Sequence, residues 1–423
     1  MKSRNQRELK RVVVTGMGSI TPLQNDPESF WQQLLVGRSG VSRITYFDTS
    51  HHRCQIAAEV KGFEASDYLS LKAAKRTERC IQFAIAGARQ ALDDAQFSID
   101  ALNASQVGVV IGTAIGGIRI FEAQANVYAQ KGPDRCSPFL TPMTICNMAA
   151  AQVAIQIGAT GPCFCPATAC AAGSNAIGDA FRLIQLGHVQ AVIAGGTEAP
   201  ITPLVIAGFE AARVVSTLNQ EPEKASRPFD KSRDGFVIGE GSGILLLEEL
   251  EHALRRGKKI YAELIGYGAS CDAHHITSPL PTGAGAAQAM RLAIEDADLS
   301  PGQVNYINAH GTSTLANDAM EIKGISLAFG ELAPLIPINS TKSMTGHLLG
   351  AAGGIEAIAT IMTITKDQIP ATLNLQNPDT ECDLDFVTKE SRHKIVDVAM
   401  SNSFGFGGHN VSLIFRKFPG MLE

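Results

Sequence analysis

Short runs of β-branched residues, many of them followed by glycine, alternate along this chain with alanine-rich segments. The strand-like runs cover residues 11–16, 107–112, 191–196, 244–247, 261–266, 304–308 and 411–415. Segments with helical composition lie between many of them, at residues 73–95, 286–296 and 350–365. Strands interspersed with helices predict a layered α/β fold.

The sequence contains no linker that would divide it into separable domains. It has 423 residues, enough for more than one domain, yet no Pro/Ser-rich stretch, charge block or low-complexity segment interrupts it. In each half a glycine- and alanine-rich turn opens a helical segment, at residues 170–186 and 347–365. This echo suggests a duplicated fold of two closely packed halves, with a catalytic group in each.

Composition argues against several classes of protein. A net charge of −5 disfavours general nucleic-acid binding. No apolar run approaches the ~20 residues that cross a bilayer, and the first ten residues lack a signal-peptide core. The 9 cysteines follow no metal-like rhythm, because Cys163 and Cys165 form a C-x-C without a second pair or a nearby histidine. We therefore expect a reducing compartment and neither a zinc site nor a disulfide framework.

Cys170 lies among small residues directly before a helical segment, in which Ile177, Phe181 and Ile184 recur at helical spacing. Small neighbours leave room for a substrate carbonyl to approach the sulfur. The positive end of a helix dipole favours thiolate over thiol. Taken alone, the residue would first be interpreted as a buried structural cysteine, and only the other motifs of the chain favour a reactive thiol.

Three further motifs carry chemically useful side chains. His310 follows a strand-like run and precedes three hydroxyl residues, where catalytic loops are common in α/β folds. Lys342 and His347 are five residues apart in a turn of small residues. Residues 401–410 alternate glycine with phenylalanine, which is typical either of a tight β-hairpin or of a gating loop that offers N–H groups to an oxyanion.

One cysteine, two histidines and a lysine suit acyl transfer through a thioester, with neutral histidines stabilising an enolate. A serine hydrolase would need a Gly-x-Ser-x-Gly elbow, and none is evident. A papain-like protease would leave the second histidine and the lysine unexplained.

The four motifs resemble those of the β-ketoacyl-acyl carrier protein synthases, most closely the synthase II type of bacteria, cyanobacteria and plastids. The resemblance covers about residues 11–415, and His409-Asn410 is similar to the cyanobacterial and plastid branch. It implies a thiolase fold with a five-layered α-β-α-β-α core, normally a homodimer. A disordered tail over 1–10 would precede a half with the nucleophile at 11–255 and a half with both histidines at 256–423.

The resemblance assigns a role to each motif. Cys170 would be the acylated nucleophile, and His310 and His347 would promote decarboxylation and stabilise the carbanion or enolate. Lys342 would support the site electrostatically, paired with Glu321.

The same resemblance gives roles to the walls of the site. The N–H groups of Cys170 and Phe404 would form an oxyanion hole, and Phe404 would gate access with Phe406 in the same loop. The implied substrate-binding residues, for the phosphopantetheine arm and the acyl chain, are Thr312, Thr314, Thr277 and Ile115.

The implied reaction condenses acyl-acyl carrier protein with malonyl-acyl carrier protein, giving 3-oxoacyl carrier protein and CO2. No redox cofactor or catalytic metal would be needed beyond the phosphopantetheine of the carrier. The partner would be acyl carrier protein, without nucleic acid or membrane, and the location cytoplasmic.

A basic stripe agrees with an acidic carrier protein as partner, although such a stripe can also be a merely solvated face. Its residues, spaced as one helical face, are Lys72, Lys75, Arg76 and Arg79. Further matches to family docking positions are Lys131, Arg135 and Arg213, whereas Asp134 is acidic where a basic residue is usual.

Two other departures concern the loops. Leu315 replaces the usual proline after the histidine motif, which predicts a looser loop, and Leu140 replaces an aromatic residue of the acyl pocket.

Three alternative functions stay open to different degrees. A thiolase would carry a second catalytic cysteine, which residues 402–410 lack. A non-catalytic chain-length factor is disfavoured by the complete motif set, and a ketosynthase of a specialised polyketide or lipid pathway is not excluded by it.

Overall fold

The first half of the chain forms five strands of a mixed sheet. The computed structural model describes residues 9–379 and 383–420. In spatial order these strands are β1 (Val12–Ile20), β7 (Gly241–Glu249), β6 (Ala191–Glu198), β4 (Val107–Gly112) and β5 (Cys163–Phe164). The central β7 is antiparallel to both β1 and β6, and β6, β4 and β5 are parallel.

The second half repeats this arrangement strand for strand. Its order is β8 (Ala262–Cys271), β14 (His409–Arg416), β13 (Val398–Gly405), β9 (Tyr306–Asn308) and β10 (Ile338–Asn339). Strand directions are the same as in the first half. In both halves the first strand along the chain pairs with the last, so the duplication suggested by the sequence is present in the topology. The two sets join where β1 pairs with β8 over residues 12–14.

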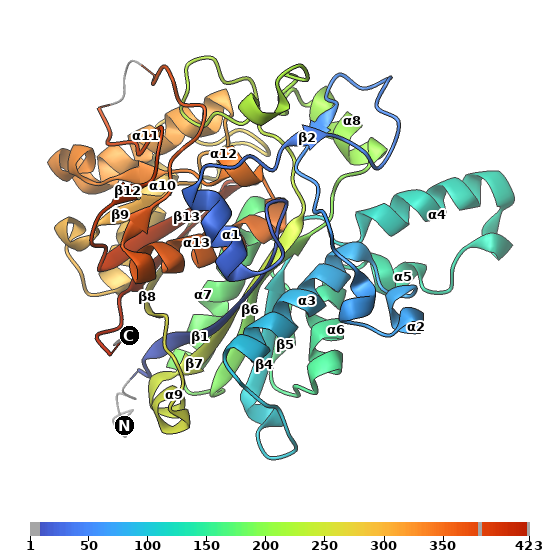
Figure 1. The fold of residues 1–423 in the computed structure, drawn as a ribbon, viewed down its shortest axis with the longest axis horizontal. Coiled ribbons are helices and arrows are strands. Elements are labelled where there is room, and N and C mark those ends of the chain that lie inside the picture. Colours follow the sequence, from blue (N-terminus) through green and yellow to red (C-terminus); the bar gives the residue numbers. More distant parts are fainter. Residues whose placement is uncertain (1–8, 380–382, 421–423) are drawn as a thin grey trace.

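Helices complete five layers (Figure 1). Outside the first set of strands lie α3 (Arg79–Asp94) and α6 (Met148–Ile157), and outside the second lie α10 (Ala284–Asp296) and α11 (Leu315–Phe329). Between them α7 (Ala172–Gln185) and α13 (Ala352–Lys366) contact each other and strands of both halves. The predicted α-β-α-β-α core is therefore confirmed.

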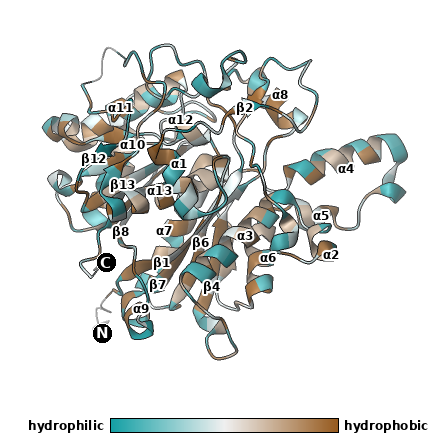
Figure 2. Ribbon diagram, in the orientation of Figure 1, coloured by the Kyte–Doolittle hydropathy of each residue, from teal (hydrophilic) through white to brown (hydrophobic). Residues whose placement is uncertain are grey.

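The middle layer explains why its sequences are so small and apolar. Every residue of α13 from Ala352 to Ile364 is buried, as expected of a helix packed on all sides. The start of α7 also packs closely against the turn that precedes α13. This contact requires glycine, because a Cβ on Gly173 would lie 2.8 Å from the carbonyl oxygen of Gly350. Figure 2 shows apolar residues concentrated on the central strands and helices.

Smaller elements surround this core. The helix α4 (Ile118–Lys131) projects from the body and has no buried residue (Figure 1). The others are α1 (Pro27–Leu35), β2 (Ser42–Arg43), β3 (Ile56–Ala57), α2 (Leu71–Ala74), α5 (Leu140–Thr144), α8 (Pro203–Ala211), α9 (Leu250–Arg256), α12 (Lys342–Thr345), β11 (Gln368–Ile369) and β12 (Arg392–His393).

Two expectations about organisation remain predictions. The boundary after residue 255 is supported by the end of α9 at Arg256 and the start of β8 at Ala262. The first eight residues of the tail expected over 1–10 lie outside the described residues.

Within residues 9–379 and 383–420, no helix has the length and apolarity needed to cross a membrane.

Candidate active site

All four motifs meet at one pocket of about 450 Å³ between the two halves. Cys170 lies in a 3-10 turn that leads into α7, and His310 follows β9. His347 follows the short helix α12, and Phe404 lies near the end of β13. A larger cleft of about 850 Å³ elsewhere is lined by residues of none of these motifs, so chemistry is concentrated at the smaller pocket.

The environment of Cys170 keeps its thiol protonated. Burial raises the pKa of Cys170 to about 12, although the charge of Lys342 and the backbone N–H of Phe406 oppose this rise. The expected effect of the helix end is thus outweighed by loss of solvation. This direction of the shift opposes the prediction that the helix end favours the thiolate.

Both histidines are neutral in this site. The rings of His310 and His347 lie 5.3 Å apart between centroids, and each residue is 2% exposed. Burial and the nearby Lys342 ammonium hold the pKa of both imidazoles well below the ordinary value. Lys342 Nζ lies 3.2 Å from His310 Nδ1. Because an ammonium can only donate, Nδ1 of His310 is the acceptor and the ring proton is on Nε2.

The partner of Lys342 differs from the one that the resemblance implied. Its ammonium forms a buried ion pair with Glu356 on α13, not with Glu321. Glu321 instead accepts the backbone N–H groups of His310 at 2.8 Å and Gly311 at 2.7 Å. Burial raises the pKa of Glu321 to about 7. Glu321 therefore positions the His310 loop, and a carboxylate that sequence reasoning missed neutralises the lysine.

The sequence does contain an indication that Glu356 has a buried partner. Glu356 is the one acidic residue of the apolar run 350–365, where an isolated carboxylate is costly unless it is paired.

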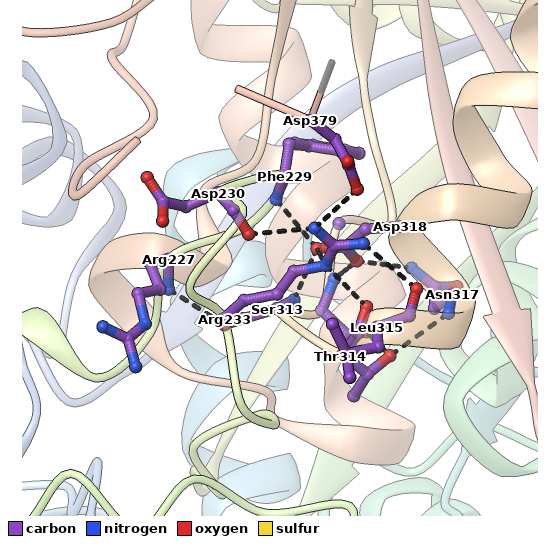
Figure 3. A network of polar contacts seen from close by, with 12 residues as sticks. Arg227, Phe229, Asp230, Arg233, Ser313, Thr314, Leu315, Asn317, Asp318 and Asp379 are labelled. Atoms are coloured by element: carbon purple, nitrogen blue, oxygen red, sulfur yellow. Dashed lines mark hydrogen bonds and ion pairs between the residues drawn. The ribbon is translucent and has the colours of Figure 1, made fainter. Parts of the chain in front are cut away.

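A buried network fixes the loop that carries Thr312 and Thr314 (Figure 3). Asp318 accepts the N–H groups of Thr312 at 3.0 Å and Ser313 at 3.1 Å. Arg233, whose side chain is 1% exposed, donates to the carbonyl oxygens of Thr314 at 3.0 Å and Leu315 at 3.1 Å. The carbonyl oxygen of Leu315 belongs to this network, and the looser loop expected from Leu315 stays a prediction.

The phenylalanine–glycine segment forms the turn of the β13–β14 hairpin. Gly407 and Gly408 have φ values of +86° and +78°, which glycine adopts without strain. A Cβ on Gly405 would lie 3.2 Å from the backbone nitrogen of Cys170, so the hairpin backbone packs directly against the cysteine turn. The pocket is also lined by residues at the remaining predicted substrate-binding positions, which are Thr312, Thr314, Thr277 and Ile115. Leu140 lies on α5 outside this lining.

The basic stripe is not one continuous helical face. The short helix α2 ends at Ala74, and α3 begins at Arg79 because Glu78 caps it through the N–H of Cys80. Arg79 turns inward, with Nη2 2.9 Å from the buried Glu240 carboxylate. The structure thus gives Arg79 a structural partner that the helical spacing did not predict, and its docking role stays a prediction.

The other basic residues of the stripe face solvent. Arg76 also stacks over the ring of Phe139 at 4.8 Å, which places α2 beside the segment that carries Arg135. The exposed residues at the remaining predicted docking positions are Lys72, Lys75, Arg76, Lys131, Arg135 and Arg213.

Comparison with known proteins gives a consistent assignment. The family described as "Beta-ketoacyl synthase, N-terminal domain" matches residues 9–253, and its C-terminal counterpart matches residues 261–376. A 3-oxoacyl-[acyl-carrier-protein] synthase 2 from Synechocystis sp. is 58% identical over 411 residues, covering 97% of this chain and 99% of that one. The protein of the same name from Staphylococcus aureus is 50% identical over 409 residues, with coverage of 97% and 99%.

Solved structures agree with these sequence matches. A ketosynthase from Burkholderia phymatum is 36% identical with a TM-score of 0.90, covering 97% of this chain and all of that one. A type II polyketide ketosynthase bound to its acyl-carrier protein is also 36% identical, with a TM-score of 0.90 and the same coverage.

Proposed function

Because this chain belongs to the β-ketoacyl synthase family, we propose that the Cys170 pocket is where it joins two acyl groups. Its reaction is the decarboxylating condensation of acyl-acyl carrier protein with malonyl-acyl carrier protein, which lengthens a fatty acyl chain by two carbons. A role in specialised polyketide synthesis is not favoured, since the relatives at 50% and 58% identity are 3-oxoacyl carrier protein synthases.

In the first stage, Cys170 takes the acyl chain. Its sulfur attacks the thioester carbonyl carbon, while the N–H groups of Cys170 and Phe404 receive the developing oxyanion. The C–S bond to the carrier breaks, and the departing pantetheine sulfur takes the proton that the cysteine loses. Because burial keeps Cys170 protonated, the proton leaves only as the bond forms.

In the second stage, the two histidines act on the malonyl group. His310 donates from Nε2, and with His347 it stabilises negative charge on the malonyl thioester oxygen. The bond to the carboxylate breaks, CO2 leaves, and the electron pair forms an enolate. The enolate carbon attacks the Cys170 thioester, the cysteine sulfur departs as a thiolate, and it takes up one proton from the solvent. No group beyond the polypeptide and the pantetheine arm enters these steps.

The observation that carries this proposal is the combination of a neutral histidine pair with a buried cation. Lys342 donates to His310 and pairs with Glu356, so positive charge lies beside the enolate while both imidazoles stay uncharged. Protonated imidazoles would bind the malonyl carboxylate and oppose its loss.

Substitution of the nucleophile tests the assignment. Cys170→Ala is expected to abolish elongation, measured by mass spectrometry of the products from a ladder of acyl carrier proteins. Decarboxylation of malonyl carrier protein remains measurable in this variant, because the histidines and lysine are intact. Elongation by Cys170→Ala would show that the nucleophile is another residue.

Three further properties belong to the same proposal. Acyl carrier protein docks on the exposed basic residues of α2 and the end of α4. The chain forms a homodimer through the free edge of β5, where Phe164 is 39% exposed. The enzyme acts in the cytoplasm, which fractionation of cells that produce it would test.

A further inference from the structure

Glu198 is a fully buried carboxylate that none of the motifs includes. It ends β6, and its side chain is 0% exposed. Oε2 accepts the backbone N–H groups of Ala114 at 2.6 Å and Gly350 at 3.1 Å. Oε1 accepts the Thr113 hydroxyl at 2.9 Å and the N–H of Ile115 at 3.2 Å.

These donors come from two walls of the active-site pocket. Ala114 and Ile115 line the pocket from the first half of the chain. Gly350 belongs to the 3-10 turn Leu349–Ala351 of the second half, which follows His347, and Leu349 also lines the pocket. The contact is tight, because a Cβ on Gly350 would lie 2.4 Å from the nitrogen of Ala114 and 2.6 Å from Glu198 Oε2.

Because the fold is duplicated, Glu198 and Gly350 can be matched with equivalent residues of the other half. In both halves a 3-10 turn with one positive φ opens the central helix, with φ +51° at Ala169 and +46° at Leu349. Gly350 is therefore the counterpart of Cys170. The strands β6 and β13, each of eight residues, hold equivalent places and end at Glu198 and Gly405.

The two counterparts differ in what faces the backbone N–H of the turn. In the second half Gly405 places no side chain beside the Cys170 N–H, and both residues line the pocket. In the first half the Glu198 carboxylate lies on the N–H of Gly350. The protein thus fills the first-half equivalent of its oxyanion hole with an anion of its own.

We propose that Glu198 is a positioning residue that clamps the Ala114–Ile115 wall of the acyl pocket to the turn that follows His347. The inference rests on the proposed function. Through one carboxylate, the clamp sets both the acyl-chain lengths that the pocket accepts and the placement of His347 for decarboxylation.

A carboxylate suits this role better than its neutral analogue. Four donors converge on two oxygens, and an anion accepts such bonds more strongly than an amide oxygen does. Burial raises the pKa of Glu198 to about 7, which these donors oppose. A glutamine would turn its own NH2 group toward backbone N–H groups and leave at least one of them unpaired.

The central test compares Glu198→Gln with the wild type in three assays. We expect kcat for condensation to fall roughly tenfold to a hundredfold, since a small misplacement of catalytic groups costs this much. The distribution of product chain lengths should shift, and malonyl decarboxylation should fall in parallel with condensation. The KM for malonyl carrier protein should stay within about twofold, because the docking residues and the Thr312–Thr314 loop are untouched.

A matched control separates positioning from general stability. Glu248→Gln removes another fully buried carboxylate, which binds Thr15, His252 and Arg256 away from the pocket. It should lower the thermal midpoint but leave kcat and the chain-length profile at wild-type values. If Glu198→Gln fails to fold, Thr113→Val removes one of the four donors and should shift the profile in the same direction.

Two outcomes overturn different statements. Wild-type kinetics and products in a folded Glu198→Gln or Thr113→Val variant would overturn the clamp, whatever their thermal stability. A wild-type protein that elongates no acyl carrier protein at all would instead overturn the proposed function.

Discussion

At the residue scale, burial determines which side chains of the site are charged. Cys170, His310 and His347 all lose solvation, which raises the pKa of the thiol and lowers that of the imidazoles. All three therefore favour their uncharged forms. The positive charge nearest the two histidines is the Lys342 ammonium, which donates to His310 and pairs with Glu356. In the proposed reaction, the substrate thioester therefore meets an uncharged nucleophile and uncharged donors, and charge develops only as it reacts.

This arrangement predicts how Cys170 responds to pH. Since its pKa is raised to about 12, the thiolate fraction is small at neutral pH and increases as pH rises. The rate of alkylation by iodoacetamide at Cys170 should therefore rise about tenfold per pH unit between pH 7 and 9, without a plateau. Peptide mass spectrometry measures the modification, with the exposed Cys271 followed as a reference in the same digest. A plateau below pH 8 would show a preformed thiolate.

Sequence motifs predicted the residues that meet in the pocket, but not the partners of those residues. The local runs around Cys170, His310 and His347 were recognisable because catalytic groups need small residues and tight turns beside them. The pairing of Lys342 with Glu356 was not, because the glutamate reaches the lysine only once α13 is packed in the middle layer.

At the element scale, short-range capping changed the predicted docking face. Residues 73–95 have helical composition, yet Glu78 caps α3 and ends the continuity with α2. Arg79 then points to the buried Glu240. Helical spacing cannot reveal such a break, because the cap competes with the helix through side-chain hydrogen bonds.

The exposed part of this face gives a prediction about carrier docking. The double change Lys75→Glu and Arg76→Glu should weaken binding of acyl carrier protein at least about tenfold at low salt, and the loss should shrink as ionic strength rises. Titration calorimetry with the carrier at two salt concentrations measures the effect. Arg255→Glu on α9 is the control, because Arg255 is also exposed but lies outside the basic stripe. Equal affinities of wild type and double variant at low salt would contradict the assignment.

At the scale of the whole molecule, duplication builds a single site from two halves. The same strand order and directions occur twice, and the two central helices bring their opening turns together. One turn supplies Cys170 and its backbone N–H. The other follows His347, and its N–H is occupied by Glu198.

The free edge of this architecture predicts an assembly. The strand β5 lies at the end of the sheet with Phe164 39% exposed, and Ile155 on the nearby α6 is 69% exposed. Unpaired apolar edges favour pairing with another chain. We expect a dimer by light scattering and a shift toward monomer in Phe164→Glu, with Leu102→Glu, an exposed apolar residue elsewhere, as control. A monomeric wild type at micromolar concentration would contradict this expectation.

By itself, the sequence determined the layered α/β class, the positions of most strands and the four reactive motifs. These depend on local periodicity and on residue types that act within a few positions of one another. Tertiary structure alone decided the ion-pair partner of Lys342, the inward turn of Arg79, the raised pKa of Cys170 and the contacts of the proposed clamp at Glu198. Each of these depends on burial and on tertiary contacts. Lys342 meets Glu356 and Arg79 meets Glu240 within one half, whereas the environments of Cys170 and Glu198 are completed only when the two halves pack.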